Sequence, residues 1–156
     1  MTDEELIKFM EGTIEVAQRR LLENALSPVA ILISEKEVHV VALDFSSLEN
    51  KRISNVRLRS LIEQMKSDAV VLVADSYYYQ GDKEKDKKVI IEEYSKLEDS
   101  KKSEAIFVCG KKAGFKRAFV VPYEKKENKI VFKEQLSLNE LSHRFLDGLF
   151  ETIVFH

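Results

Sequence analysis

Apolar residues near the amino end of the chain recur with the period of an α-helix. They stand at alternating intervals of three and four residues: Ile7, Met10, Ile14, Ala17 and Leu21. This spacing gathers them on one helical face, and Thr2 and Glu5 have the capping-box pattern that begins a helix. Pro28 disfavours helical geometry in the residue before it, so the helix should end within residues 24–27.

The segments that follow have the pattern of a β-hairpin and a second helix. Residues 29–33 form a short apolar run, and residues 38–43 are rich in β-branched side chains. Only the polar turn 34–37 separates them, so the two segments are expected to pair. Residues 44–54 are polar and irregular. A second helix, ending near residues 67–68, is predicted from apolar positions at helical spacing: Val56, Leu58, Leu61, Ile62 and Met65.

The carboxyl half is dominated by runs without polar interruption: residues 69–74, 105–109 and 118–121. Such runs are typical of strands buried on both faces, so these strands should be central in a sheet. Residues 129–133 form a last strand. The loops 110–114 and 124–128 are short enough for antiparallel hairpins, so this half of the chain is predicted to be a β-meander.

A charged insertion and a terminal helix complete the pattern. Residues 80–103 hold acidic and basic side chains in equal number, so the insertion is polyampholytic and is not a basic tail. The final helix is predicted from Leu138 to about Val154. Its apolar side comprises Leu138, Leu141, Phe145, Leu149 and Ile153.

These elements predict a single α+β domain over residues 1–156. We expect a mainly antiparallel sheet of five or six strands, the hairpin plus the meander, packed with about three long helices in the order α-β-β-α-β-(insertion)-β-β-β-α. A chain of 156 residues is long enough to bury one core. Strands that are apolar on both sides need cover on both faces, so either the helices divide between the faces or a partner subunit completes one of them.

Composition excludes several classes of protein. Hydrophobic residues make up 44% and charged residues 33%, a balance that excludes disordered chains and membrane-spanning chains. No apolar stretch approaches the ~18 residues of a spanning helix, and the acidic start at Asp3, Glu4 and Glu5 is unlike a signal peptide. We therefore expect a cytoplasmic protein with no membrane partner. The excess of Lys and Glu suggests a thermophilic origin.

Residues that could support catalysis or a cofactor are few. The glycines have neither Walker nor dinucleotide-binding spacing: Gly12, Gly81, Gly110, Gly114 and Gly148. Gly110 and Gly114, between two predicted strands, are interpreted as turn glycines. Cys109, the single cysteine, ends an apolar run and is interpreted as a small buried hydrophobe. No two histidines have metal-ligand spacing: His39, His143 and His156. We therefore predict no cofactor, no metal and no catalytic residue.

One pair of carboxylates gives the best indication of an enzyme. Asp75 ends one apolar strand, and Glu104 begins the next candidate strand. If the sheet brings them together, they could hold a divalent metal, as in a metal-dependent hydrolase. Acidic residues at strand ends more often serve solubility, so this function is the second alternative.

The preferred hypothesis is a non-enzymatic binding or assembly module that self-associates as a homodimer. Three consecutive tyrosines, Tyr77, Tyr78 and Tyr79, directly precede the insertion, and tyrosine is favoured at binding surfaces. The wide apolar face of the last helix would form an interface or part of the core: Phe145, Leu146, Leu149, Phe150, Ile153 and Val154.

The first alternative is a surface that binds nucleic acid or another polyanion. Residues 51–66 and 111–126 are strongly basic, whereas the chain as a whole has a formal net charge of -2. If these two segments adjoin in space, they would form a basic surface with an aromatic side chain available to stack on a base. The candidate anion-binding residues are Arg57, Arg59, Lys111, Lys112, Phe115, Lys116 and Arg117.

Overall fold

The first helix begins where its cap predicts. The computed structural model describes residues 1–79 and 102–138, and in it α1 spans Asp3–Leu22. The Thr2 hydroxyl accepts a hydrogen bond of 3.1 Å from the backbone N–H of Glu5, which satisfies one of the unpaired donors of the first turn. Ile7 is only partly buried, and Leu6 takes its place in the buried stripe: Leu6, Met10, Ile14, Ala17 and Leu21.

The predicted hairpin is confirmed, but the second helix starts earlier than expected. β1 (Val29–Ile33) pairs antiparallel with β2 (Val38–Ala42). α2 spans Leu48–Met65, so the expectation that residues 44–54 are irregular is wrong for their second half. The Ser47 side chain caps α2 by accepting a 3.0 Å hydrogen bond from the backbone N–H of Asn50. The first turns of α2 bury no apolar stripe, so periodicity did not reveal them.

The predicted meander is also confirmed, and its strands extend beyond their apolar centres. The chain passes through four strands, each antiparallel to the next. They are β3 (Ala69–Tyr79), β4 (Lys102–Lys112), β5 (Phe115–Lys126) and β6 (Lys129–Phe132).

A short additional strand replaces the predicted start of the last helix. β7 (Leu136–Leu138) pairs antiparallel with the Ala118–Val120 part of β5. The helix predicted from Leu138 is therefore wrong at its first residue, because Leu138 closes β7. Residues 139–156, which would form the rest of that helix, lie outside the described residues.

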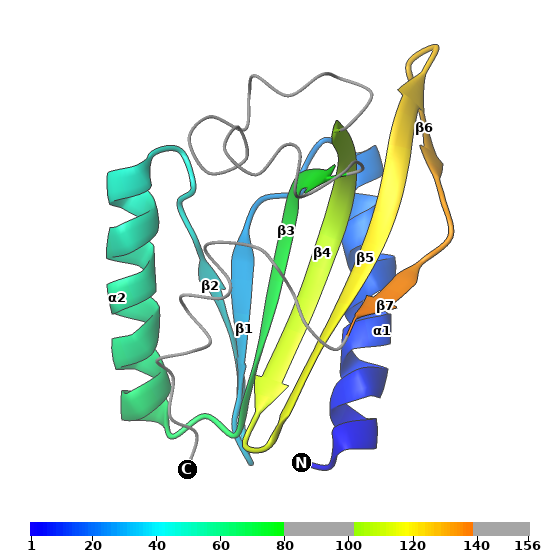
Figure 1. Cartoon of the computed structure of the whole chain (residues 1–156). Coiled ribbons are helices and arrows are strands. Elements are labelled where there is room, and N and C mark those ends of the chain that lie inside the picture. Colours follow the sequence, from blue (N-terminus) through cyan, green and yellow to red (C-terminus); the bar gives the residue numbers. More distant parts are fainter. Residues whose placement is uncertain (80–101, 139–156) are drawn as a thin grey trace, which may run out of the picture.

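The strands form one antiparallel sheet of seven strands in the order β2-β1-β3-β4-β5-β6, with β7 beside β5 (Figure 1). The α+β class and the antiparallel sheet are thus confirmed. Over residues 1–79 and 102–138, two helices accompany the sheet. α2 carries the chain from β2, across the neighbouring β1, to β3.

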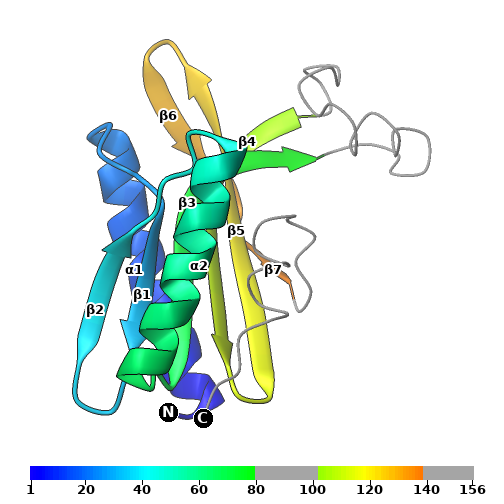
Figure 2. The same cartoon turned by 90° about the vertical axis from the view of Figure 1, so that its left-hand side faces the viewer.

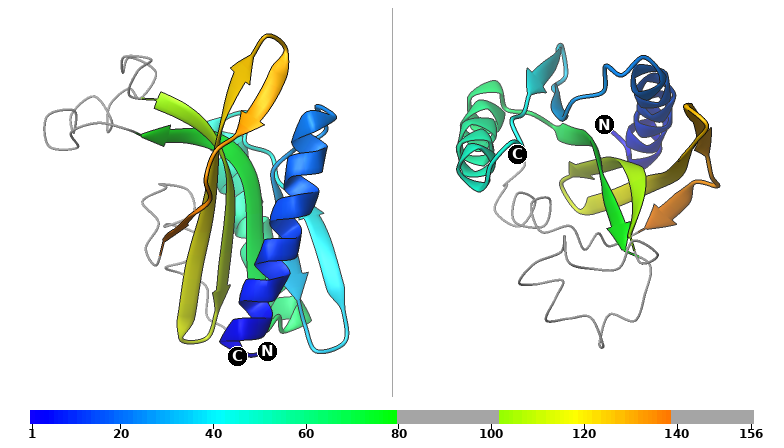
Figure 3. Two further views of the ribbon diagram at one scale, coloured as in Figure 1. Left: turned by 90° about the vertical axis from the view of Figure 1, so that its right-hand side faces the viewer. Right: turned by 90° about the horizontal axis from the view of Figure 1, so that it is seen from above.

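The two helices cover opposite faces of the sheet, as the views in Figures 2 and 3 show. Side chains of the central strands alternate between the faces. The α1 side takes Val71, Val73, Ile106, Val108, Phe119 and Val121. The α2 side takes Val70, Leu72, Phe107, Cys109, Ala118 and Val120. Both sets are buried within the chain, so a partner subunit is not needed to complete either face.

A glycine in β4 allows α1 to approach the sheet closely. Gly110 was predicted to be a turn glycine, but it lies inside β4, opposite Arg117 of β5. A Cβ atom at Gly110 would stand 2.5 Å from Sδ of Met10, a buried residue of α1. Gly114 does form the turn, with the positive φ of 73° that glycine tolerates.

Substitution of Gly110 should therefore reveal the helix-to-sheet contact. We expect Gly110→Ala to lower the free energy of unfolding by about 1–3 kcal/mol, because the added methyl group overpacks the core against Met10. In a Met10→Ala background the same change should be nearly neutral. Urea unfolding of the two single variants and the double variant measures this coupling.

Gly12 provides the matched control for this experiment. A Cβ atom at Gly12 meets no other atom within 4 Å, so Gly12→Ala should stabilise α1 by roughly 0.5–1 kcal/mol. An equal loss of stability from Gly110→Ala with and without the Met10 side chain would contradict the proposed contact.

Candidate functional site

β2 presents one open edge of the sheet. Among the described residues it pairs with β1 alone. A backbone hydrogen bond of 2.9 Å stands at each end of the β1–β2 pair. One runs from the Ser34 N–H to the Glu37 carbonyl, and the other from the Leu43 N–H to the Pro28 carbonyl. Because hydrogen-bonded positions alternate along an antiparallel pair, the backbone N–H and C=O groups of the intervening residues point away from β1. These residues are Val38, Val40 and Ala42.

This edge has none of the usual protection against strand addition. Proteins commonly blunt an exposed edge with Lys, Pro or a bulge. β2 contains none of these over Val38–Ala42, and it pairs with β1 in unbroken register. The side chains of Val38 and Val40 are 56% and 67% exposed. They lie on the α1 side of the sheet, since they stand opposite Ile33 and Ile31 of that side.

A partly open cleft of about 210 Å³ adjoins the same strand. It lies between the carboxyl end of β2 and the amino-terminal half of α2, and it combines apolar walls with polar groups. Its lining residues are Val41, Ala42, Leu43, Asp44, Asn50, Ile53, Ser54 and Arg57. Val41 and Ala42 of β2 line this cleft, so it borders the open edge. We call the cleft together with the edge the β2–α2 groove.

Hydrogen bonds around Asp44 hold the far end of the groove in place. Its carboxylate accepts bonds from the Ser46 hydroxyl (2.6 Å), the Ser46 N–H (2.9 Å) and the Asn50 side-chain amide (3.1 Å). The two bonds from Ser46 lower the pKa of Asp44, because they favour the ionised carboxylate. The Asp44 N–H in turn donates to the Ser54 hydroxyl at 3.0 Å. These contacts fix the loop after β2 to the first turns of α2.

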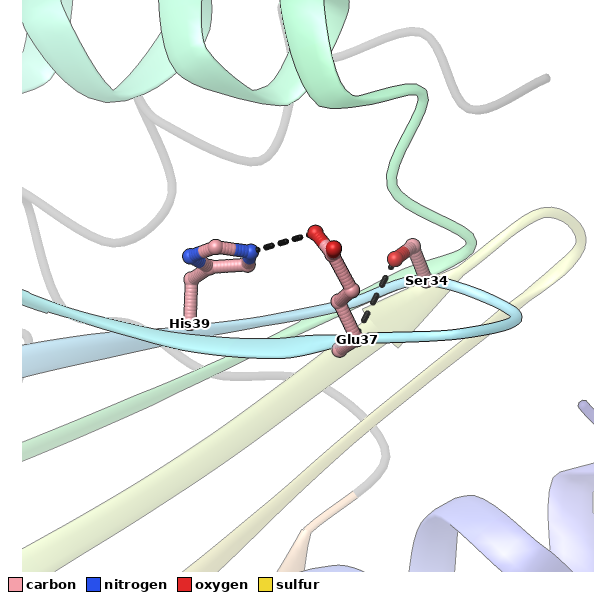
Figure 4. A network of polar contacts seen from close by, with 3 residues as sticks. All are labelled: Ser34, Glu37 and His39. Atoms are coloured by element: carbon pink, nitrogen blue, oxygen red, sulfur yellow. Dashed lines mark hydrogen bonds and ion pairs between the residues drawn. The ribbon is translucent and has the colours of Figure 1, made fainter.

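The opposite end of β2 carries a small polar network on the α2 side (Figure 4). The Nε2 atom of His39 lies 2.8 Å from Oε2 of Glu37. The Ser34 hydroxyl donates a bond of 3.2 Å to the carbonyl of Glu37. Both members of the His39–Glu37 pair are exposed, which agrees with the interpretation of His39 as an edge residue. Because side chains alternate along a strand, both Glu37 and His39 point to the same side of β2 as α2.

The two carboxylates predicted as a metal pair meet at a tyrosine. The buried Tyr123 donates a hydrogen bond of 3.0 Å from its hydroxyl to Oδ2 of Asp75. Glu104 stands opposite Tyr123 in the sheet, and its Oε2 lies 3.7 Å from Nζ of Lys125. The pKa of the Tyr123 phenol is raised, chiefly by burial. The charge of Asp75 and its hydrogen bond raise the pKa further, and Glu104 contributes least. No group of three or more potential metal ligands gathers in residues 1–79 and 102–138.

The basic residues are divided between the two faces of the sheet. Lys111 and Lys116 stand directly opposite each other on the α2 side. Phe115 packs on the α1 side, where the guanidinium carbon of Arg117 lies 5.5 Å from its ring centroid. Lys112 Nζ forms an ion pair of 2.6 Å with Asp3 of α1. The candidate residues of segment 111–126 are therefore divided between the two faces, and anion binding stays a prediction.

The other predicted site residues are only partly within the described structure. The backbone of Tyr77, Tyr78 and Tyr79 lies in β3, paired with the start of β4. Cys109 is buried, as predicted. The remaining self-association and metal candidates lie outside the described residues: Phe145, Leu146, Leu149, Phe150, Ile153, Val154, His143 and His156.

The site that the sequence did not reveal is the open edge itself. A weak signal was present, because residues 38–42 contain no charged side chain immediately after a strongly polar turn. Which strand lies at the edge is a property of the sheet order, and the local pattern does not contain it.

Comparison with known proteins adds no relative. The chain matches no protein-family model, no curated protein and no solved structure. Within the described ranges, neither helix is both long enough and apolar enough to cross a membrane.

The raised pKa of Tyr123 has a measurable consequence at alkaline pH. Its stabilisation is fully present below the unfolded pKa of about 10 and is lost as pH rises towards the higher folded pKa. Between pH 10 and pH 11 the free energy of unfolding of the wild type should therefore fall further than that of Tyr123→Phe, by about 1 kcal/mol over this pH unit. Urea unfolding across this range tests the difference, and parallel pH profiles would contradict the assignment.

Proposed function

We propose that the chain is a non-enzymatic binding and assembly module that forms a homodimer by strand pairing at β2. The observation that carries this proposal is the open edge itself: a strand without Lys, Arg, Asp or Glu, with outward backbone groups at Val38, Val40 and Ala42 and exposed valine side chains. An added strand would satisfy these backbone groups and cover the valines.

The proposal does not depend on an uncovered sheet face. Both faces of the central strands are buried within one chain, so the need to cover a sheet face is no longer a reason to expect a dimer. The support comes instead from the edge of the same sheet, because antiparallel pairing of two identical strands is self-complementary about a two-fold axis.

The other end of the strand order differs from β2 in the way expected of a protected edge. β6 has four residues and begins with Lys129. Next to it, Glu124 pairs with Lys133 at 2.7 Å and with Lys126 at 3.1 Å. Charged side chains and short strands both disfavour further pairing. This contrast favours β2 as the edge used for association.

A charged residue at the centre of β2 tests the proposal. Val40→Lys should convert the dimer to a monomer, because it places two cations next to each other where the strands would meet. The side chain of Val40 is 67% exposed, so the fold of the single chain should be retained. Sedimentation equilibrium at concentrations on the order of 10–100 µM measures the association.

Val56→Lys is the matched control for this change. Val56 lies in α2 and is also 67% exposed, so the variant has the same added charge away from β2. It should remain as dimeric as the wild type. A wild type that is monomeric throughout the concentration range, or an equal effect of the two substitutions, would refute association through β2.

A further inference from the structure

We infer that the β2–α2 groove sets the register of the homodimer: each copy receives Glu37 and His39 of its partner, and Arg57 pairs with the partner's Glu37. This inference rests on the proposed function. It adds a specific alignment of the two strands, with the two-fold axis at Val40, and it assigns to Arg57 the role of selecting the partner strand.

The alignment follows from the outward backbone groups of β2. In an antiparallel pair of identical strands centred on Val40, Val38 stands opposite the partner's Ala42, and Val40 stands opposite the partner's Val40. All three outward-facing residues then form hydrogen-bonded pairs. A symmetric alignment shifted along the strand by one residue in either direction moves part of the pairing onto residues outside Val38–Ala42. Centring on Val40 therefore uses the whole strand.

This alignment brings polar side chains of the partner to the groove. Side chains opposite each other in a sheet lie on the same face. The partner's His39 then stands beside Val41, and the partner's Glu37 stands beside Leu43. Val41 and Leu43 both line the cleft under α2, and Figure 4 shows Glu37 and His39 projecting to that side of β2.

The cleft contains one carboxylate and one cation, Asp44 and Arg57. The Asp44 oxygens already accept hydrogen bonds from Ser46 and Asn50, so Arg57 is the charge left to pair with the partner's Glu37. Arg57 is an exposed residue of α2 that lines the cleft together with Leu43. In the part of the chain that the structure describes, it forms no ion pair of its own. Among residues 1–79 and 102–138, the Glu37 carboxylate has one such contact, with His39. Because the dimer has two-fold symmetry, the contact between Arg57 and the partner's Glu37 occurs twice, once at each groove. Opposite charges across an interface select the partner and the alignment.

Charge reversal tests the contact. Glu37→Arg and Arg57→Glu should each raise the Kd of the dimer by about tenfold, because each places like charges at both grooves. The double variant Glu37→Arg/Arg57→Glu should return the Kd to within about threefold of the wild-type value. Arg52→Glu, at an exposed position of α2 that does not line the cleft, is the matched control and should leave the Kd unchanged. Sedimentation equilibrium measures all four.

Disulfide trapping tests the alignment independently. Val40→Cys should form a disulfide between the two copies under mild oxidation, because the Cα atoms of a hydrogen-bonded antiparallel pair lie about 5.5 Å apart. Val38→Cys should not, since the two copies of this residue would be separated by several residues along the strands. The native Cys109 is buried and does not compete. Non-reducing gel electrophoresis measures the product.

The outcomes separate this inference from the proposed function. If Val40→Lys abolishes the dimer but the charge reversals leave its Kd unchanged, β2 is the interface and the assignment of Arg57 is wrong. If Val38→Cys is trapped and Val40→Cys is not, the alignment is wrong. If the wild type is monomeric, the proposed function and this inference fail together.

Discussion

A sheet whose central strands are apolar on both faces must be covered twice, and the architecture of this chain follows from that requirement. β3, β4 and β5 direct alternate apolar side chains to the two sides, so leaving either side open to water would cost the burial that stabilises the domain. α1 covers one side, and it can do so closely because Gly110 leaves room for Met10. α2 covers the other side as it carries the chain from β2 past β1 to β3. The same crossover leaves β2 at the margin of the sheet and places α2 beside it, which creates the β2–α2 groove.

The sequence predicts those helices and strands that have a cap, an apolar stripe or an uninterrupted apolar run within their own residues. The Thr2 cap and the apolar stripe of α1, and the uninterrupted runs of the meander, correspond to real elements because burial and periodicity coincide there. The start of α2 was missed because Leu48 and Ile53 are exposed, so its first half has no buried stripe and only the Ser47 cap indicates it. β7 is three residues long, too short for a pattern to form.

The candidate site was less predictable, because it depends on tertiary relationships. Val38 and Val40 resemble the valines of buried strands, and only the sheet order exposes them. Gly110 has the appearance of a turn glycine until α1 is placed over it. The division of the basic residues could have been foreseen: once β4 and β5 are extended to Lys112 and Phe115, alternation sends neighbouring cations to opposite faces. Asp75 and Glu104 both interact with the phenol of Tyr123, which comes from the next strand, β5.

The contrast between the two margins of the sheet has a consequence for how far association can proceed. Two chains joined at β2 would present β6 and β7 at each outer margin. Lys129 and the lysines paired with Glu124 lie at β6, and β7 is only three residues long. Those margins are poor templates for a further chain, so growth would stop at a closed pair and not continue into a fibre. An unprotected strand is hazardous when both margins can propagate. In the proposed dimer each chain would cover the β2 edge of the other, so a strand without Lys, Pro or a bulge could stand at the edge of the single chain without leading to polymers.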